Sequence, residues 1–313
     1  MMMAFFLEGT PKMSRRLFRY LYACSFAFVA ATNASAQVVN PATAQAKPAE
    51  PAQEASGKLH TWEMPPITVE GKAPLFEEDL IGSYGQPRWT AHRRFGETRV
   101  YVIPAGMVEF EYWLRPTIGK DGAPTKIRSM YEAEFGLPGR LQLDLYAVGN
   151  KEGKDGSFAI DSQKVELRYA LANWGKIWGN PTLYGEWTQE SGGNDFAEGK
   201  LLLGGHLVSG WHWGSNLVWE QQVGGVKERS LEWTTGWSYS ARDAKAAVGI
   251  ETQLAFVSEV EAASRGKSSR EFLIGPSFQF RFLPQMHLDI APLFGVTKDA
   301  PRAKMFVVFG WEM

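Results

Sequence analysis

The chain has 313 residues, and its 33 basic and 34 acidic side chains leave a formal net charge of −1, which argues against a general nucleic-acid binder because such a protein needs surplus cations. The single cysteine excludes a disulfide framework and a cysteine-based zinc cluster. Beyond the N-terminus no apolar run approaches the roughly 18 residues of a membrane-spanning helix. The aromatic content of 13% and the mean hydropathy of −0.24 are compatible with the alternating strands of a membrane β-barrel.

The N-terminus has the three parts of a secretory signal peptide. Three arginines precede the apolar stretch Leu21–Ala31, and Ala34-Ser35-Ala36 offers a cleavage site made of small residues. We therefore predict a signal peptide over residues 1–36, with Met13 as an alternative start of translation.

Two further interpretations of this end stay open. Arg15-Arg16 fits a twin-arginine signal, which exports folded proteins, and Leu21–Cys24 weakly resembles a lipoprotein box. Cleavage after Ala36 would remove Cys24, and a mature chain without cysteine suits an oxidising compartment.

Residues 37–106 are predicted to be a Pro/Ala-rich linker followed by a periplasmic or barrel-mouth segment. Residues 37–60 carry too little apolar surface to offset the entropy cost of ordering them. Pro65–Gly71 is similar to the short box of TonB-dependent receptors, but the chain is far too short for the plug and large barrel of those proteins. We expect residues 72–106 to fold against or inside the mouth of a barrel.

Residues 107–313 alternate between apolar and polar side chains, which is the pattern of strands with two different faces. In the first run, Val108 and Phe110 alternate with Glu109 and Glu111. About twelve such runs predict strands over residues 108–118, 126–137, 141–149, 159–171, 181–190, 198–208, 211–222, 228–240, 246–258, 271–283, 286–296 and 303–313. Most have 10–13 residues, which matches a tilted strand across the roughly 25 Å apolar core of a bilayer.

The predicted fold class is therefore all-β, a single-chain antiparallel transmembrane β-barrel of about 12 strands, with a range of 10–14. A soluble β-sandwich or barrel is the alternative. A soluble protein would turn its apolar face inward and would need no polar interior, so the strand length, the aromatic content and the charges on the minor face argue against it.

The connections between the runs alternate in length. Tight turns are predicted at 138–140, 209–210, 242–243 and 283–285, with the longer segment 172–180 as an exception, and longer polar loops lie between them. An even strand count leaves both chain ends on the periplasmic side, and the short loops leave little material for a plug.

The aromatic last strand, Phe306–Met313, resembles the signal that the barrel-assembly machinery reads. Aromatic residues near strand ends suit interfacial girdles, as at Trp113, Trp187, Trp211, Trp219 and Tyr239.

If the apolar face meets lipid, the charged face lines the lumen. The predicted lumen-lining acids are Glu109, Glu111, Glu132, Glu134, Asp144, Glu166, Glu186, Glu220, Glu232, Glu251, Asp289 and Glu312. The predicted lumen-lining bases are Arg115, Arg128, Lys164, Arg168, Lys200, Lys245, Arg281 and Lys304, to which His206 and His287 are added. So many charges must be hydrated or paired. The excess of acids predicts a mildly acidic lumen that favours cations, and the alternative is an interior sealed by salt bridges.

Motifs for chemistry are weak. His206 and Ser209 are the nearest approach to a base and a nucleophile, but residues three apart on one strand face opposite sides, and no G-x-S-x-G elbow accompanies them. His206 and His212 with Glu220 would make a poor metal site. We therefore predict no catalytic residue, no metal site and no cofactor.

The hairpin Glu132–Leu141 resembles those of the outer-membrane barrels grouped with the MetA-pathway phenol-degradation proteins. Asn180–Tyr184, Gly275–Gln279 and Pro292–Gly295 fit the same style of barrel, and the resemblance covers roughly residues 97–313. It implies a transporter of small molecules, including hydrophobic or aromatic ones, and it supplies no individual site residue.

The predicted function is that of a passive outer-membrane channel for small molecules in a Gram-negative bacterium. The alternatives are an outer-membrane lipid hydrolase and a sealed structural or adhesive envelope barrel. The expected partners are outer-membrane lipid, the barrel-assembly machinery and a small-molecule solute, and no nucleic acid is expected. The sequence leaves the permeant molecule and the oligomeric state open.

Overall fold

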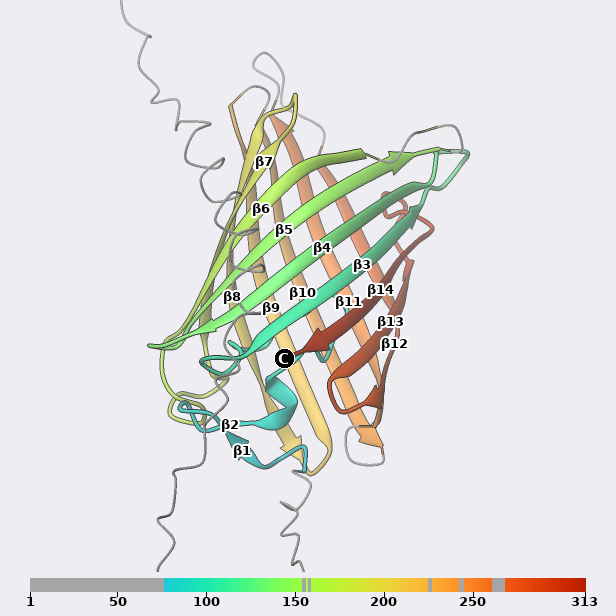
Figure 1. Cartoon of the computed structure of the whole chain (residues 1–313). Helices are drawn as coiled ribbons and strands as arrows, with labels where there is room; N and C mark the ends of the chain where they lie inside the picture. The colour runs from blue at the N-terminus through green and yellow to red at the C-terminus, as the bar shows by residue number, and fades with distance from the viewer. Residues whose placement is uncertain (1–75, 154–155, 157–158, 225–226, 242–244, 261–267) are drawn as a thin grey trace, which may run out of the picture. The chain divides into compact units, whose positions relative to one another are not determined.

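Figure 1 shows the computed structural model of the chain. It describes residues 76–153, 156, 159–224, 227–241, 245–260 and 268–313. The predicted signal peptide and the linker up to residue 75 lie outside these residues, so their boundaries stay predictions. The described part contains no helix with the length and hydropathy needed to cross a bilayer.

Within the described residues, twelve antiparallel strands form a closed barrel (Figure 1). They are β3 (Val108–Ile118), β4 (Lys126–Leu137), β5 (Leu141–Glu152), β6 (Ala159–Ala170), β7 (Thr182–Glu190), β8 (Asp195–Val208), β9 (Trp211–Val223), β10 (Lys227–Ala241), β11 (Ala246–Val260), β12 (Ser268–Leu283), β13 (Met286–Gly295) and β14 (Ala303–Glu312). Each strand pairs with its neighbour in sequence, and β14 closes the barrel on β3 through partners such as Phe309 and Tyr112. The predicted fold class and strand count are confirmed.

The predicted strand positions agree with the observed strands, with the largest differences at the ends that lead into the longer loops. β8 begins at Asp195 rather than at residue 198, and β12 begins at Ser268 rather than at residue 271. The extra residues of β12, Ser268–Arg270, are polar on both faces, so the alternation between apolar and polar residues fades there while the backbone ladder continues. We call the end that holds the β4–β5, β8–β9 and β12–β13 connections the turn end, and the opposite end the loop end.

The outer surface of the barrel is apolar. Large hydrophobic side chains are exposed along the strands, and they include Leu167, Leu217, Trp219, Trp233, Trp237, Phe256, Phe280 and Phe309. Trp237 is 58% exposed, whereas Glu111 on the opposite face is 2% exposed. An apolar surface of this extent suits contact with lipid rather than water. The soluble alternative, which places the apolar face inside, is therefore wrong.

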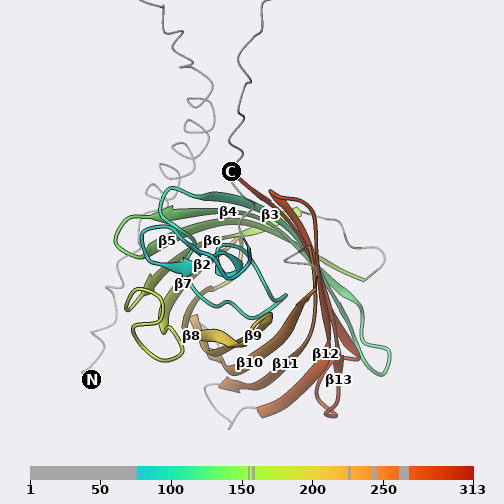
Figure 2. The same ribbon diagram turned by 90° about the horizontal axis from the view of Figure 1, so that it is seen from below.

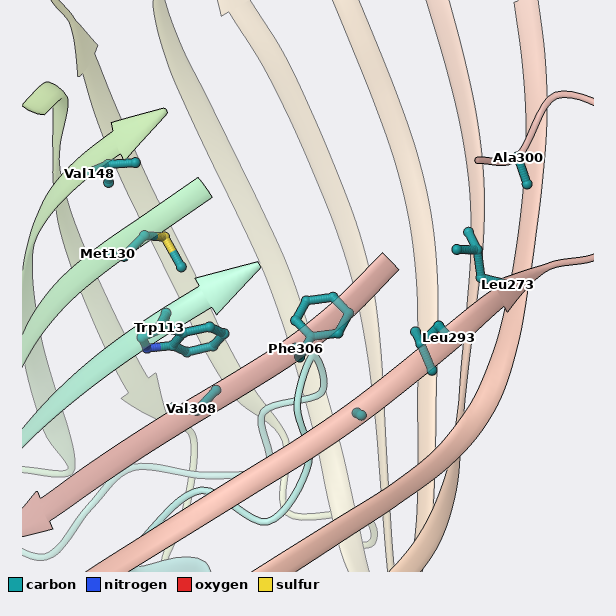
Figure 3. Close-up of a cluster of buried hydrophobic side chains, with 9 residues drawn as sticks. Trp113, Met130, Val148, Leu273, Leu293, Ala300, Phe306 and Val308 are labelled. Carbon is teal, nitrogen blue, oxygen red and sulfur yellow. The ribbon is translucent and has the colours of Figure 1, made fainter. Parts of the chain in front are cut away.

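The inner face is not uniformly polar. Figure 3 shows an inward-facing cluster, defined by Trp113, Met130, Val148, Leu273, Ala291, Leu293, Ala300, Phe306 and Val308, that lines one side of the barrel. Most of its members lie on β12, β13, β14, β3 and β4, which are neighbours in the wall. Trp113 therefore points into the barrel, and its predicted place in an interfacial aromatic girdle is wrong because residue 113 has the inward parity of β3.

Candidate functional site

The chain segment before β3 enters the barrel. It contains β1 (Leu80–Ile81), β2 (Gln86–Pro87) and the short 3-10 helix η1 (Arg88–Thr90). Figure 2 shows the part after β1 within the ring of strands. We call residues 84–104 the inner segment; its residues Trp89, Phe95 and Val102 are fully buried. The inner segment is the part of the predicted barrel-mouth segment that contacts the inner wall of the barrel, and residues 72–75 lie outside the described residues.

Hydrogen bonds fix the inner segment at the turn end. The Tyr84 hydroxyl donates to the Leu137 carbonyl at 2.6 Å, where β4 ends. The Tyr101 hydroxyl donates to the Ala172 carbonyl at 2.5 Å, just beyond β6. The N-terminal segment, and not a loop between strands, supplies the residues that occupy the turn end of the lumen.

Glycines make room for the inner segment in one part of the wall. Gly204 on β8 pairs with Gly214 on β9, which in turn pairs with Gly236 on β10, so the three form one row. A Cβ atom at Gly236 would lie 2.5 Å from Phe95 Cδ1, and a Cβ atom at Gly204 would lie 2.3 Å from a methyl group of Val100. The absence of side chains at these three glycines thus lets the inner segment pack directly against the wall.

Neutral amide side chains of the wall satisfy the backbone of the inner segment. The Arg99 amide donates to Asn216 Oδ1 at 2.7 Å, and Asn216 Nδ2 donates to the Arg99 carbonyl at 2.6 Å. The Ile103 amide donates to Gln142 Oε1 at 2.8 Å. Because an irregular buried backbone has no ladder partner, these amides prevent buried polar groups from going unpaired.

A cluster of charges holds the middle of the inner segment against β3 and β4. Arg93 Nη2 lies 2.5 Å from Glu111 Oε2, and its Nε donates to Glu111 Oε1 at 2.9 Å. Arg99 Nη2 donates to Glu132 Oε1 at 2.8 Å and to Glu134 Oε1 at 3.0 Å. The Arg93 guanidinium also stacks 3.8 Å from the centre of the Trp113 ring.

Electrostatics make this cluster a strong attachment. Burial alone lowers the pKa of Arg99, but the carboxylates of Glu134, Glu132 and Glu111 outweigh it and raise the pKa well above its ordinary value. Arg99 therefore stays charged. Removing either partner would leave a buried charge without compensation. The resulting loss of stability is larger than the net stabilisation that the intact pair provides.

Two histidines lie beside one another at the turn end. His287 lies between two carboxylates, with Nδ1 at 2.5 Å from Asp289 Oδ2 and Nε2 at 2.6 Å from Glu109 Oε1. The His92 ring of the inner segment is 6.2 Å from that of His287, and burial, with Arg281 and His287 nearby, lowers the pKa of His92 well below its ordinary value. Both ring nitrogens of His287 are thus engaged by carboxylates of the wall.

On the loop side of the inner segment lies a cavity of about 240 Å³. Glu97 and Arg99 of the inner segment line it together with wall residues. Its charged lining consists of the bases Arg99, Arg115, Arg128, Lys164, Lys200 and Lys304 and the acids Glu97, Glu166, Glu186, Glu198, Glu220 and Glu232. Some are paired, as Lys164 Nζ is with Glu186 Oε1 at 2.5 Å. The lumen is therefore a charged chamber that ends at the inner segment.

The predicted lumen residues divide between these two regions. Nine of them line the cavity: Arg115, Arg128, Lys164, Glu166, Glu186, Lys200, Glu220, Glu232 and Lys304. Others are buried in the wall around the inner segment: Glu109, Glu111, Glu132, Glu134, Asp144, Arg168, Glu251, Arg281, His287 and Asp289. Glu312 pairs with Arg281 at the turn end. His206 and Lys245 are exposed near the β8–β9 and β10–β11 turns, outside the enclosed interior.

Arg93 and Arg99 are not among the lumen residues predicted from the sequence. A signal was present, because an arginine-rich segment, 88–99, precedes a strand pair whose polar face is acidic. The excess of wall acids that predicts a cation preference lies mainly around the inner segment. The cavity itself has six bases and six acids in its lining.

No protein-family model matches the sequence, and no curated protein sequence matches it. Among solved structures, the chain is similar to a COG4313 outer membrane channel from Pseudomonas putida F1, with a TM-score of 0.52 and 10% identity over 71% of this chain and 100% of that one. It also matches the NanC porin, with a TM-score of 0.44 and 10% identity over 65% of this chain and 97% of that one. The KdgM porin matches with a TM-score of 0.41 and 11% identity over 65% of this chain and 98% of that one. The first of these likenesses supports an outer-membrane type of barrel fold, and the finer resemblance to phenol-degradation barrels stays a prediction.

Proposed function

We propose that this chain is an outer-membrane channel for small molecules in a Gram-negative bacterium, and that the inner segment closes its lumen at the turn end. The observation that carries the proposal is the charged cavity inside a lipid-facing barrel, which ends at the inner segment. A barrel that served only as an anchor would have no need of so many inward charges, whereas a water-filled passage keeps them hydrated.

The proposal requires that the inner segment move for solutes to pass. The inner segment is not part of the strand ladder, so its movement would break its own contacts, among them the charge pairs of Arg93 and Arg99, and leave the barrel strands paired. Twelve strands enclose a lumen wider than that of eight-stranded barrels, whose interior side chains can fill it, so the barrel becomes a passage when the inner segment leaves.

The orientation follows from the connections. In outer-membrane barrels short turns face the periplasm and longer loops face outward, so the turn end and the inner segment are placed at the periplasmic side. The exported chain would reach this membrane by its signal peptide and insert with the barrel-assembly machinery, which would read the last strand.

The hydrolase alternative has little to support it. His206 and Ser209 are exposed beside the β8–β9 turn, and in the described part of the chain no hydrogen bond joins them. One observation favours the sealed envelope barrel, which is that the inner segment occupies the lumen. A measurement of solute permeation distinguishes a sealed barrel from a channel.

The test is permeation of small solutes into liposomes that contain the purified full-length protein. We expect slow swelling in small sugars and none in large oligosaccharides, because solutes pass only while the inner segment has moved away from its closing position. Liposomes with heat-unfolded protein are the control. Impermeability to every small solute would overturn the channel and leave the sealed barrel.

A further inference from the structure

One wall of the cavity carries three cations on neighbouring strands. Arg115 on β3 and Arg128 on β4 are direct partners in the ladder, and Lys304 lies on β14, the other neighbour of β3. All three line the cavity. Like charges directly opposite each other on a sheet destabilise it, so this arrangement calls for an explanation.

Within the described residues, the hydrogen bonds and ion pairs give these three cations one carboxylate partner, Glu97, while Glu186, Glu190 and Glu220 act on Arg128 from farther away. Arg115 Nη1 is 4.0 Å from Glu97 Oε2, and Lys304 Nζ donates to the neutral amide oxygen of Gln253 at 2.8 Å. Arg128 Nε is buried without a hydrogen-bond partner among the residues that the structure describes. Elsewhere in the interior arginines have close carboxylates, as Arg99 does at 2.8 Å.

We propose that Arg115, Arg128 and Lys304 bind the carboxylate of a small organic anion that enters the cavity from the loop end. The proposal rests on the proposed function and names the class of solute. A guanidinium presents paired N–H donors that match the two oxygens of a carboxylate. The cavity of about 240 Å³ is smaller than the sites of drug-sized ligands, about 300–1,000 Å³, which restricts the ligand to a small molecule.

Glu97 connects this site to the inner segment. Its carboxylate is the acid nearest to Arg115 in the ion pairs of the described residues, and its amide is held by Glu251 Oε2 at 3.0 Å. A ligand carboxylate would compete with Glu97 for Arg115. Binding would thus weaken one of the contacts between the inner segment and the wall.

The experiment is calorimetric titration of the purified full-length protein in detergent at low salt, with benzoate as the probe and benzyl alcohol as its uncharged analogue. We expect benzoate to bind and benzyl alcohol not to bind. The variants Arg128→Gln and Arg115→Gln each lose a charged hydrogen-bond donor, so the affinity should fall by about ten- to a hundredfold. Glu97→Gln removes the competing carboxylate, and the affinity should rise.

Lys176→Gln is the matched control, because Lys176 is an exposed lysine in the β6–β7 connection, away from the cavity, and its removal changes the net charge equally. It should leave the affinity unchanged. Absence of binding by the native protein, equal affinity for benzyl alcohol, or unchanged affinity in both arginine variants would overturn the proposal. Binding is measured without any passage of solute, so a protein that binds benzoate but fails to swell liposomes would contradict the channel and keep the site.

Discussion

Replacing residues 84–104 by a flexible Gly/Ser linker of the same length is expected to open the barrel. In planar bilayers the variant should give current steps much larger than those of the native protein, because the inner segment fills the turn end of the lumen. Its removal also frees the wall carboxylates that hold Arg93 and Arg99, among them Glu111, Glu132 and Glu134. The variant should therefore prefer cations more strongly than the native protein.

The variant must keep a folded barrel for this comparison. Folding is checked by the different gel mobility of heated and unheated samples, since the strands pair with one another and not with the inner segment. Native and linker forms that conduct equally would show that the inner segment does not close the lumen.

The substitution Arg99→Ala should strongly destabilise the protein. Glu132 and Glu134 would remain buried with their closest cationic partner removed, and such a loss typically costs about 3–5 kcal/mol. The free energy of unfolding, measured by urea titration in lipid vesicles, checks the effect. A protease should also cut the inner segment faster in the variant than in the native protein.

Two further variants separate the charge effect from a general defect. Lys176→Ala removes an exposed cation and should change the free energy of unfolding little. Combining Arg99→Ala with Glu132→Gln removes one of the uncompensated charges and should recover part of the lost stability. If Arg99→Ala were as stable as the native protein, the charge cluster would not hold the inner segment.

The barrel could be predicted from sequence because its determinants are local. Each strand shows alternation within its own residues, as between Leu231 and Glu232, and the ladder joins strands that follow one another in the chain. Even the closure of β14 on β3 follows from the need to pair every edge in lipid. The exposed outer face and the charged inner face were therefore predictable.

The candidate site was less predictable, because its contacts join residues that are far apart in the sequence and share no strand pattern. The inner segment is irregular, so no periodicity shows that Arg99 lies beside Glu132 or that Phe95 rests on Gly236. The alternation along a strand shows that an acid points into the barrel, but it does not show which residue the acid contacts there. Alternation alone therefore predicts that Glu111 and Glu134 attract cations in the lumen, whereas in the structure they bind Arg93 and Arg99 of the inner segment.

The most direct test of the account is a disulfide that locks the inner segment to the wall. Thr98 and Thr234 suit it, because their hydroxyl oxygens are 3.1 Å apart, one on the inner segment and one on β10. With both residues changed to cysteine, current through single barrels in a planar bilayer should be absent under oxidising conditions and should return when a reductant is added. Equal current in the oxidised and reduced forms would contradict a lumen that the inner segment closes.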